Sequence, residues 1–360
     1  MEQHGEGAKS SSSSQAPRPA VAGDAPSRAA LGSSGVSSGA GASAQALGQQ
    51  LCDALAIPYG LYNGSNNMCF INASLQGLFA LPPLRRLLAA YCTRELLAQF
   101  PVQEWKDEVA YDLPLLDRLA LTLHHSVTTK KVFEASLFTK VRYHGDHRYE
   151  GRQEDAHEFL HSRTVLSESA GAALSQLFQC VDVPQLVCGS CGDIGAGARE
   201  CCTCLSLPLL HRDGTKLNTV GAALQEYVLQ EECMWARFGC TEAGRQRVGS
   251  STKQTKFVRL PAALVIHLVR WDEHGAALVH FVQPDIDIHL QGRRYTLNAV
   301  VCHVGPSCRG GHYLTFAQYG EQWWLFNDGM RRMAKEHEIA QWSRAGYDDK
   351  TYLLMYSAAT

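Results

Sequence analysis

The sequence predicts an α+β fold in which a helical half comes first and a mostly antiparallel sheet follows. From position 59 to about 169, apolar residues recur with the three-to-four-residue spacing of helices. After Gln176 the pattern changes to short apolar or alternating runs, which are typical of strands. Because the two kinds of element are separated along the chain, we expect the halves to pack against each other with a cleft between them.

The helices are predicted from apolar periodicity and from proline positions. In the first helix Ile71, Leu75 and Leu78 share one face, and the pair Pro82-Pro83 ends it because proline cannot continue a helix. Pro114 starts a later helix, since proline fits the first turn. The helices are expected over residues 70–81, 84–100, 115–126, 153–165 and 220–233.

The strands are predicted from alternation and from β-branched and aromatic residues. They are expected over residues 181–187, 203–209, 264–269, 295–304, 313–319, 323–326 and 352–356. The short segment 319–322 contains a glycine, so the strands on either side of it should form a hairpin.

Residues 1–50 are dominated by Ser, Ala and Gly and show no apolar periodicity. Such a segment cannot bury enough surface to offset the entropy of ordering it, so we predict a disordered tail followed by one folded domain over residues 51–360. The composition loosely suits a transit peptide, but acidic residues balance the basic ones, which argues against import into an organelle.

The charge balance excludes several classes of function. Lys and Arg number 33 against 35 Asp and Glu, so no global field would recruit a nucleic acid or an anionic membrane. There is also no apolar run of the ~18 residues that cross a bilayer, and no secretory signal pattern. We expect a soluble protein of the cytoplasm or nucleus. In such a compartment the 13 cysteines are thiols, metal ligands or a nucleophile rather than a disulfide framework.

Cys69 is the candidate nucleophile. It lies where the first helix begins, and a helix N-terminus stabilises a thiolate through unpaired N–H groups and the positive end of the dipole. The segment 60–68 before it is rich in residues that form tight turns and offer donors to a developing oxyanion. Taken alone, Cys69 could equally be a buried structural thiol.

His312 is the candidate base for this thiol. It follows Gly310-Gly311, and the hairpin after it returns to Asn327-Asp328. The hairpin should therefore place His312 beside Asn327, which would orient the imidazole, with Asp328 as the alternative orienting residue. Because Cys69 comes from the helical half and His312 from the sheet half, the site is expected in the cleft.

Three motifs in this order resemble those of the ubiquitin-specific proteases, a family of papain-like cysteine peptidases. The cysteine motif is matched at residues 60–63 and 67–76, and the middle motif, QEDAHEFL, at 153–160. The histidine motif is matched at 311–313 and 323–328, and the resemblance runs from about 59 to 356. No single one of these motifs would be specific, but their order and extent are.

The resemblance implies a papain-like fold with a helical thumb (about 59–170), a fingers extension (about 176–260) and a palm of antiparallel sheet (about 260–357). It implies a thiol-dependent peptidase that hydrolyses the peptide or isopeptide bond after the C-terminal glycine of ubiquitin. Ubiquitin or ubiquitinated proteins are the expected partners. Two alternatives stay open: an inactive scaffold that binds ubiquitin, and a peptidase for another ubiquitin-like modifier.

The resemblance also assigns residues to the tail of ubiquitin. Gln153 and Asp155 of the middle motif, together with Gly311 and Tyr313, are expected to line a narrow acidic channel for that tail. The other interpretation of the middle motif is a solvated helix face with its apolar residues in the core, and both can hold at once.

The oxyanion donor departs from the family pattern. Asn63 lies one residue farther from Cys69 than the corresponding asparagine does in the family, and Gly64 occupies the expected spacing. Asn63, Asn66 and Asn67 are therefore competing donors, alongside backbone amides.

Half of a zinc site is present in the expected fingers. Cys188 and Cys191 have the spacing of a zinc knuckle, but Cys240 lacks the second cysteine that the family supplies. We therefore expect no cofactor and a degenerate, metal-free knuckle; a structural zinc on Cys188, Cys191 and Cys240 is the alternative. Its fourth ligand would have to come from Cys201, Cys202, Cys204 or Cys233.

Overall fold

The computed structural model describes most of the chain after residue 56. The described residues are 57–64, 67–92, 94–99, 113–129, 131–139, 151–163, 171–189, 192, 194–229, 231–233, 237–238, 247–248, 251–271, 278–307, 310–335, 338 and 349–359. All of them belong to one compact unit, Ala40–Thr360. The predicted tail, residues 1–50, lies outside the described residues.

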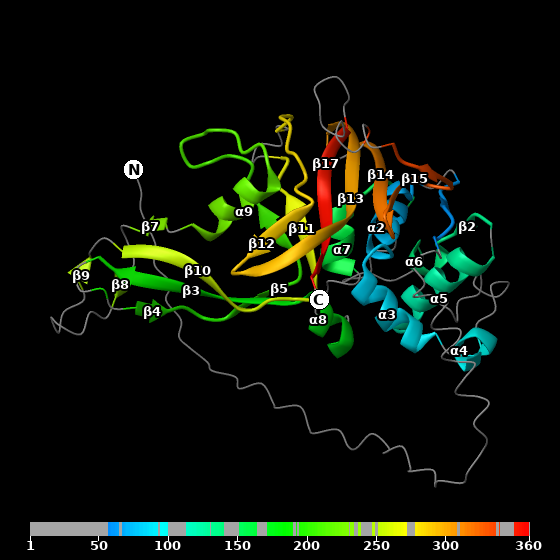
Figure 1. Cartoon of the computed structure of the whole chain (residues 1–360), viewed down its shortest axis with the longest axis horizontal. Coiled ribbons are helices and arrows are strands. Elements are labelled where there is room, and N and C mark those ends of the chain that lie inside the picture. The colour runs from blue at the N-terminus through cyan, green and yellow to red at the C-terminus, as the bar shows by residue number, and fades with distance from the viewer. Residues whose placement is uncertain are drawn as a thin grey trace, which may run out of the picture. The chain divides into compact units, whose positions relative to one another are not determined.

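Helices dominate the first part of the described chain, as the periodicity predicts, and α2 to α6 gather beside one another (Figure 1). The helices are α2 (Cys69–Leu78), α3 (Pro82–Tyr91), α4 (Arg94–Gln99), α5 (Leu115–Thr128), α6 (Ser136–Thr139), α7 (Ala156–Arg163), α8 (Ala172–Phe178) and α9 (Val220–Val228).

The helices expected over 70–81 and 153–165 are shorter, Cys69–Leu78 and Ala156–Arg163, and two further predictions were wrong about where a helix continues. The helix expected over 84–100 begins at Pro82, because proline is tolerated in the first turn, and the chain leaves the helix at Cys92 before α4 starts. The helix expected over 220–233 ends at Val228, and Glu231–Cys233 instead forms strand β7. Pairing with a neighbouring strand outweighs local helix propensity there.

An eight-stranded sheet forms the centre of the fold. Its order is β16-β15-β14-β13-β17-β11-β6, with β12 paired to β13. Neighbouring strands of this sheet are antiparallel except β6 and β11, which are parallel. The strands are β6 (Leu205–Leu207), β11 (Ala263–Leu268), β12 (Asp287–Leu290), β13 (Arg293–Ser307), β14 (Gly310–Tyr319), β15 (Gln322–Asn327), β16 (Met330–Met333) and β17 (Asp349–Ala358).

A second sheet of five strands is built on two long antiparallel strands, β3 (Cys180–Cys188) and β10 (Ser251–Arg259), which stand out in Figure 1. Three short strands pair with them: β4 (Ile194–Ala196), β5 (Glu200–Cys202) and β7. Two further strand pairs complete the described structure. They are β1 (Leu61–Tyr62) with β2 (Phe133–Glu134), and β8 (Arg237–Phe238) with β9 (Arg247–Val248).

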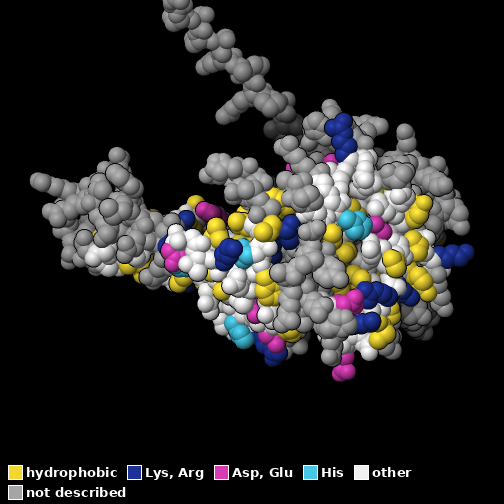
Figure 2. Space-filling model, turned by 90° about the horizontal axis from the view of Figure 1, so that it is seen from above, with side chains coloured by type: hydrophobic (Ala, Val, Ile, Leu, Met, Phe, Trp, Pro, Cys, Tyr) yellow, Lys and Arg dark blue, Asp and Glu magenta, His cyan; other side chains and the backbone are white. Residues whose placement is uncertain are grey.

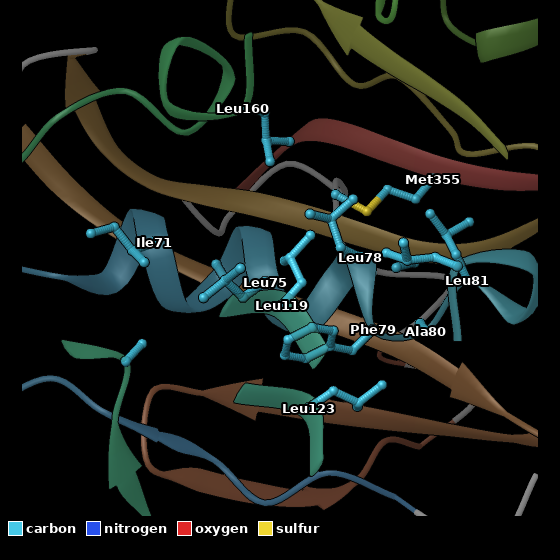
Figure 3. Close-up of a cluster of buried hydrophobic side chains, with 14 of the residues drawn as sticks. Ile71, Leu75, Leu78, Phe79, Ala80, Leu81, Leu119, Leu123, Leu160 and Met355 are labelled. Atoms are coloured by element: carbon cyan, nitrogen blue, oxygen red, sulfur yellow. The ribbon is translucent and has the colours of Figure 1, made fainter. Parts of the chain in front are cut away.

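Both faces of the eight-stranded sheet are covered. Along β17 the side chains alternate, so Leu353 and Met355 join the cluster under the helices while Leu354 and Tyr356 join a second cluster on the opposite face. Figure 3 shows Met355 among side chains of α2 and α5. Since burying one such side chain contributes about 2 kcal/mol, this packing holds α2 firmly against the sheet.

The described surface carries charges of both signs. On the face shown in Figure 2, Lys and Arg side chains are interspersed with Asp and Glu. Within the described part of the chain, none of the helices combines the length and apolarity needed to cross a membrane.

Candidate active site

Cys69 is the first residue of α2, as the sequence predicts, and its side chain is buried. The N-cap residue, Met68, makes no side-chain capping bond, so it does not occupy the N–H groups of the first turn. Thr315 of β14 donates a hydrogen bond of 2.7 Å to the carbonyl oxygen of Ala73. This bond fixes the nucleophile helix against the strand that carries His312.

The predicted hairpin places His312 beside Asn327. Strand β14 turns directly into β15, and His312 Nε2 lies 2.7 Å from Asn327 Oδ1. The imidazole also shares a hydrogen bond with the Cys69 side chain. Since Nε2 faces the amide oxygen, Nδ1 is the ring nitrogen left for the thiol.

The surroundings of His312 favour its protonated form. The hydrogen bond to Cys69 is the largest cause, and together with the bond to Asn327 and the charge of Asp328 it raises the pKa of His312 to about 9, against the opposing effect of burial. At neutral pH the ring therefore carries a proton that it can give to a leaving group.

Asn327, and not Asp328, is the direct partner of His312. Asp328 Oδ2 lies 3.8 Å from His312 Nε2, which is beyond hydrogen-bond distance. Asp328 also has a φ of 48°, in the left-handed region, and its carboxylate oxygens accept hydrogen bonds from Asn72 of α2 and from Asn63.

Asp328 joins the two halves of the site. Its Oδ1 accepts a bond of 2.9 Å from Asn72 Nδ2, and its Oδ2 accepts one of 2.9 Å from Asn63 Nδ2. Its carbonyl oxygen accepts from Gln76 Nε2 at 3.1 Å and from the Leu61 N–H at 3.0 Å. One residue of the sheet half is thus held by four residues of the helical half.

Sequence reasoning missed Asn72 and Gln76. Both are fully buried polar residues on α2, one and two helical turns after Cys69. That spacing places all three side chains on one face, so the helical periodicity contained a signal for them. A buried amide needs a hydrogen-bond partner, and here the partner is Asp328.

The backbone at Gly60 packs directly against the backbone of Asp328 and Gly329, at the turn that follows β15. A Cβ atom added at Gly60 would overlap the backbone of Asp328 and Gly329. The segment that leads to the nucleophile therefore passes the end of the hairpin at backbone distance, which a larger residue would prevent.

The loop before Cys69 accommodates its extra residue with two left-handed positions. Gly64 has a φ of 55° and Asn67 a φ of 52°. Asn63 Oδ1 accepts a bond of 2.7 Å from the Met68 N–H, so its side chain lies next to the nucleophile. Asn67 Nδ2 donates instead to the carbonyl oxygen of Gly151 at 2.9 Å. Of the competing donors Asn63 is the one held near Cys69, while Asn66 lies outside the described residues.

Gln153 lies beside the glycine pair that precedes His312. Its Oε1 accepts a bond of 3.1 Å from the Gly311 N–H. Its Nε2 is buried and makes no hydrogen bond to any described residue, and the neighbouring Gly311 is exposed. A side chain at Gly311 would overlap the carbonyl oxygen of Val304 and crowd His303 Nε2 at 2.6 Å.

Asp155 is held by two tyrosines. Its Oδ2 accepts from the hydroxyls of Tyr352 at 2.6 Å and Tyr313 at 3.2 Å, and its Oδ1 accepts from the Glu158 N–H at 2.9 Å, which caps α7. Burial raises the pKa of both tyrosines, so both stay protonated donors. Tyr352, on β17, was not predicted as a site residue, and Tyr313 is fully buried beneath Asp155.

Comparison with known proteins assigns the chain to a family. The sequence profile described as ubiquitin carboxyl-terminal hydrolase matches residues 59–356. The chain belongs to this family. The predicted family is therefore confirmed.

Curated relatives in this family are longer than the chain. Ubiquitin carboxyl-terminal hydrolase 36 of Drosophila ananassae is 28% identical over 280 residues, which are 71% of this chain and 25% of the relative. The probable ubiquitin carboxyl-terminal hydrolase 8 of Schizosaccharomyces pombe is 26% identical over 155 residues, 38% of this chain and 30% of the relative. The chain thus spans less than a third of the length of these relatives.

Solved structures confirm the predicted α+β fold class. A chain of the SAGA Ubp8/Sgf11/Sus1/Sgf73 DUB module bound to ubiquitin aldehyde matches with a TM-score of 0.62 and 20% identity, covering 86% of this chain and 71% of that one. A chain of the SAGA DUB module bound to monoubiquitin matches with a TM-score of 0.56 and 20% identity, covering 86% of this chain and 70% of that one.

The metal-free knuckle expected for this ubiquitin carboxyl-terminal hydrolase stays a prediction, as does its alternative, a zinc on Cys188, Cys191 and Cys240. Cys188 is half-buried at the end of β3, whereas Cys191 and Cys240 lie outside the described residues. Cys201 is exposed, Cys202 is half-buried and Cys204 is buried near the base of the same sheet.

Proposed function

We propose that this chain is a cysteine peptidase that hydrolyses the peptide or isopeptide bond after the C-terminal glycine of ubiquitin. The observation that carries this function is the position of His312, which is hydrogen-bonded both to the Cys69 side chain at a helix N-terminus and to Asn327. A nucleophile, a base and an orienting residue are thereby in contact, in a chain whose family is named for the reaction.

In the first step the Cys69 sulfur attacks the carbonyl carbon of the terminal glycine. The imidazolium of His312 gives its proton to the amine nitrogen as the C–N bond breaks, and a thioester between Cys69 and the glycine results. In the second step His312 takes a proton from water, whose oxygen attacks the thioester. The carboxylic acid product leaves, and the Cys69 thiolate and the His312 imidazolium with which the first step began are restored.

Asn63 is the residue that we assign to the oxyanion. Its Nδ2 has two hydrogens, and only one is used by Asp328. The other can donate to the negatively charged oxygen, together with backbone N–H groups at the start of α2.

The tail of ubiquitin would pass between Gln153 and the exposed Gly311. The Nε2 of Gln153 would donate to a backbone carbonyl of the tail, and Asp155 would face its basic side chains. Tyr313 has no exposed surface, so we revise its expected part from direct contact to support of the Asp155 carboxylate.

A scaffold that binds ubiquitin without cleaving it is the second candidate. Asn63 is bound at both ends of its amide, to Met68 and Asp328, and this favours the scaffold if the side chain is too constrained to follow the oxyanion. The two candidates differ in turnover and share the binding of ubiquitin.

A ubiquitin probe with a thiol-reactive C-terminus separates these functions. We expect the full chain to form a covalent adduct, Cys69→Ala to form none, and the exposed Cys201→Ser to react like the wild type as a matched control for surface thiols. The equivalent probes made from other ubiquitin-like modifiers test which modifier the active site recognises. Binding of ubiquitin with no adduct and no turnover would support the scaffold, and neither binding nor adduct would contradict both.

A further inference from the structure

Cys180 and Cys202 form a pair of cysteines outside the active site. Cys180 is the first residue of β3 and Cys202 is the last residue of β5. These strands are antiparallel, and the register places Cys180 directly opposite Cys202. The pair is therefore defined by the sheet and does not depend on an irregular loop.

The register gives the spacing that a disulfide requires. Directly opposite residues of antiparallel strands have Cα atoms about 4.5 to 5.5 Å apart, and disulfides span about 4.4 to 6.8 Å. The two side chains are hydrogen-bonded, so the sulfurs face each other.

The two thiols differ in access to solvent. Cys180 is 1% exposed, whereas Cys202 is half-buried and lies at the edge of the second core cluster. The neighbouring residue along the strand, Cys201, is exposed and pairs with Val181. Because side chains alternate along a strand, Cys201 points away from Cys180.

We propose that Cys180 and Cys202 form a site of reversible oxidation to a cross-strand disulfide, with a peroxide as oxidant. The Cys202 thiolate attacks one oxygen of hydrogen peroxide, the O–O bond breaks, and Cys202 becomes a sulfenic acid while hydroxide leaves. The Cys180 sulfur then attacks the Cys202 sulfur, the S–O bond breaks, and water leaves. In total, two thiols and one peroxide give one disulfide and two waters.

The site lies where the two sheets meet. Strand β3 belongs to the five-stranded sheet, whereas the chain after β5 continues within a few residues into β6 of the eight-stranded sheet. The disulfide would tie the inner end of the long β3 strand to the segment that enters the central sheet. It would thus restrain the base of the β3–β10 strand pair, which is separate from the reaction at Cys69.

Hydrogen peroxide on the purified full chain, followed by alkylation and peptide mass spectrometry, tests this proposal. We expect a peptide containing Cys180 linked to one containing Cys202, with a mass two hydrogen atoms below the sum of the two free peptides. The linked peptide should disappear after treatment with dithiothreitol. The readout is a mass, so it is independent of peptidase activity. Oxidation of Cys69 is recorded in its own peptide.

Two variants make the test specific. Cys201→Ser should form the link as the wild type does, because its side chain is on the other face. Cys180→Ser should abolish the link and leave Cys202 to oxidise to sulfinic or sulfonic acid, since no resolving thiol remains. The same irreversible oxidation of Cys202 in the wild type, a link through Cys201 or Cys204, or no loss of either thiol at peroxide concentrations that oxidise Cys69 would overturn the proposal.

Discussion

The two sides of the active site are built in different ways. His312 and Asn327 both lie in the paired part of the sheet: His312 of β14 is opposite Val304 of β13, Asn327 of β15 is opposite Met330 of β16, and β14 pairs with β15 from Thr315 and Phe326 onward. Asn63 lies on an irregular loop, between a short strand and α2, in which Gly64 and Asn67 have positive φ. A regular ladder specifies position through register, whereas a loop needs individual side-chain bonds to do so, and here Asp328 supplies one of them.

The largest expected loss of activity follows from substitution of His312, on the strand side of the site. His312→Ala should lower kcat/KM by about 10⁴-fold or more, because the base for water and the acid for the leaving amine are lost together. Steady-state hydrolysis of a fluorogenic ubiquitin conjugate measures it, with binding of ubiquitin as the control for folding. A variant that keeps a tenth of the activity would show that another group acts as the base.

Removal of the Asn63 side chain, on the loop side of the site, should lower activity by a smaller factor, because its bond to the oxyanion stabilises only the transition state. Asn63→Ala should lower kcat by ~10²-fold with little change in KM, since the oxyanion exists only during reaction. Asn67→Ala is the matched control and should change kcat by less than about threefold, because its amide is bound to Gly151.

The reverse order of these two effects would show that the loop shifts register when substrate binds. If neither substitution changes kcat in an active enzyme, backbone amides alone stabilise the oxyanion.

Asp328, the residue shared by both sides of the site, should give a smaller loss of activity together with a loss of stability. Asp328→Asn replaces one acceptor oxygen by a donor, which then faces Asn63 or Asn72 without a partner. A buried donor left unsatisfied costs about 1 to 3 kcal/mol, and we expect kcat/KM to fall about tenfold. Chemical denaturation and kinetics measure the two effects, and a change in stability with full activity would restrict Asp328 to a structural role.

The smallest expected effect is a shift in a pH profile. His312 has a pKa of about 9, above the ordinary value, so its proton is held at neutral pH and lost as the pH rises through 9. Activity should fall along the same limb. Asn327→Ala removes one cause of the raised pKa, so the limb should move to lower pH, whereas an unchanged limb would mean that Asn327 does not act through His312.

The same contrast explains what the sequence could predict. The start of α2 at Cys69 and the hairpin from β14 to β15 follow from helical spacing and from alternation around a turn. Strand β10 was missed because its sequence, STKQTKFVR, is mostly polar, and its pairing with β3 and β7 supplies the stability that its own pattern does not show.

The bonds at Asp328 were beyond prediction for another reason. They join Asn63 and Asn72 to a residue more than 250 positions away, and a carboxylate after a strand could equally face solvent. Its left-handed φ suits the Asp328-Gly329 turn between β15 and β16, but the residues that its carboxylate then meets depend on the rest of the fold. The hydrogen bond from Tyr352 to Asp155 could not be predicted for the same reason. It depends on the position of β17 in the strand order of the sheet, which brings Tyr352 close to the start of α7.

The central place of β17 has a consequence for how the protein is made. This strand fills the gap between β13 and β11, and its Met355 packs with the nucleophile helix, yet the ribosome delivers it after every other described strand. A nascent chain that already contains Cys69, His312 and Asn327 therefore still lacks the middle of its sheet and exposes two unpaired strand edges. Activity should consequently appear only when the last strand has been released, and the interval before it is the time at which the chain is most exposed to misassembly.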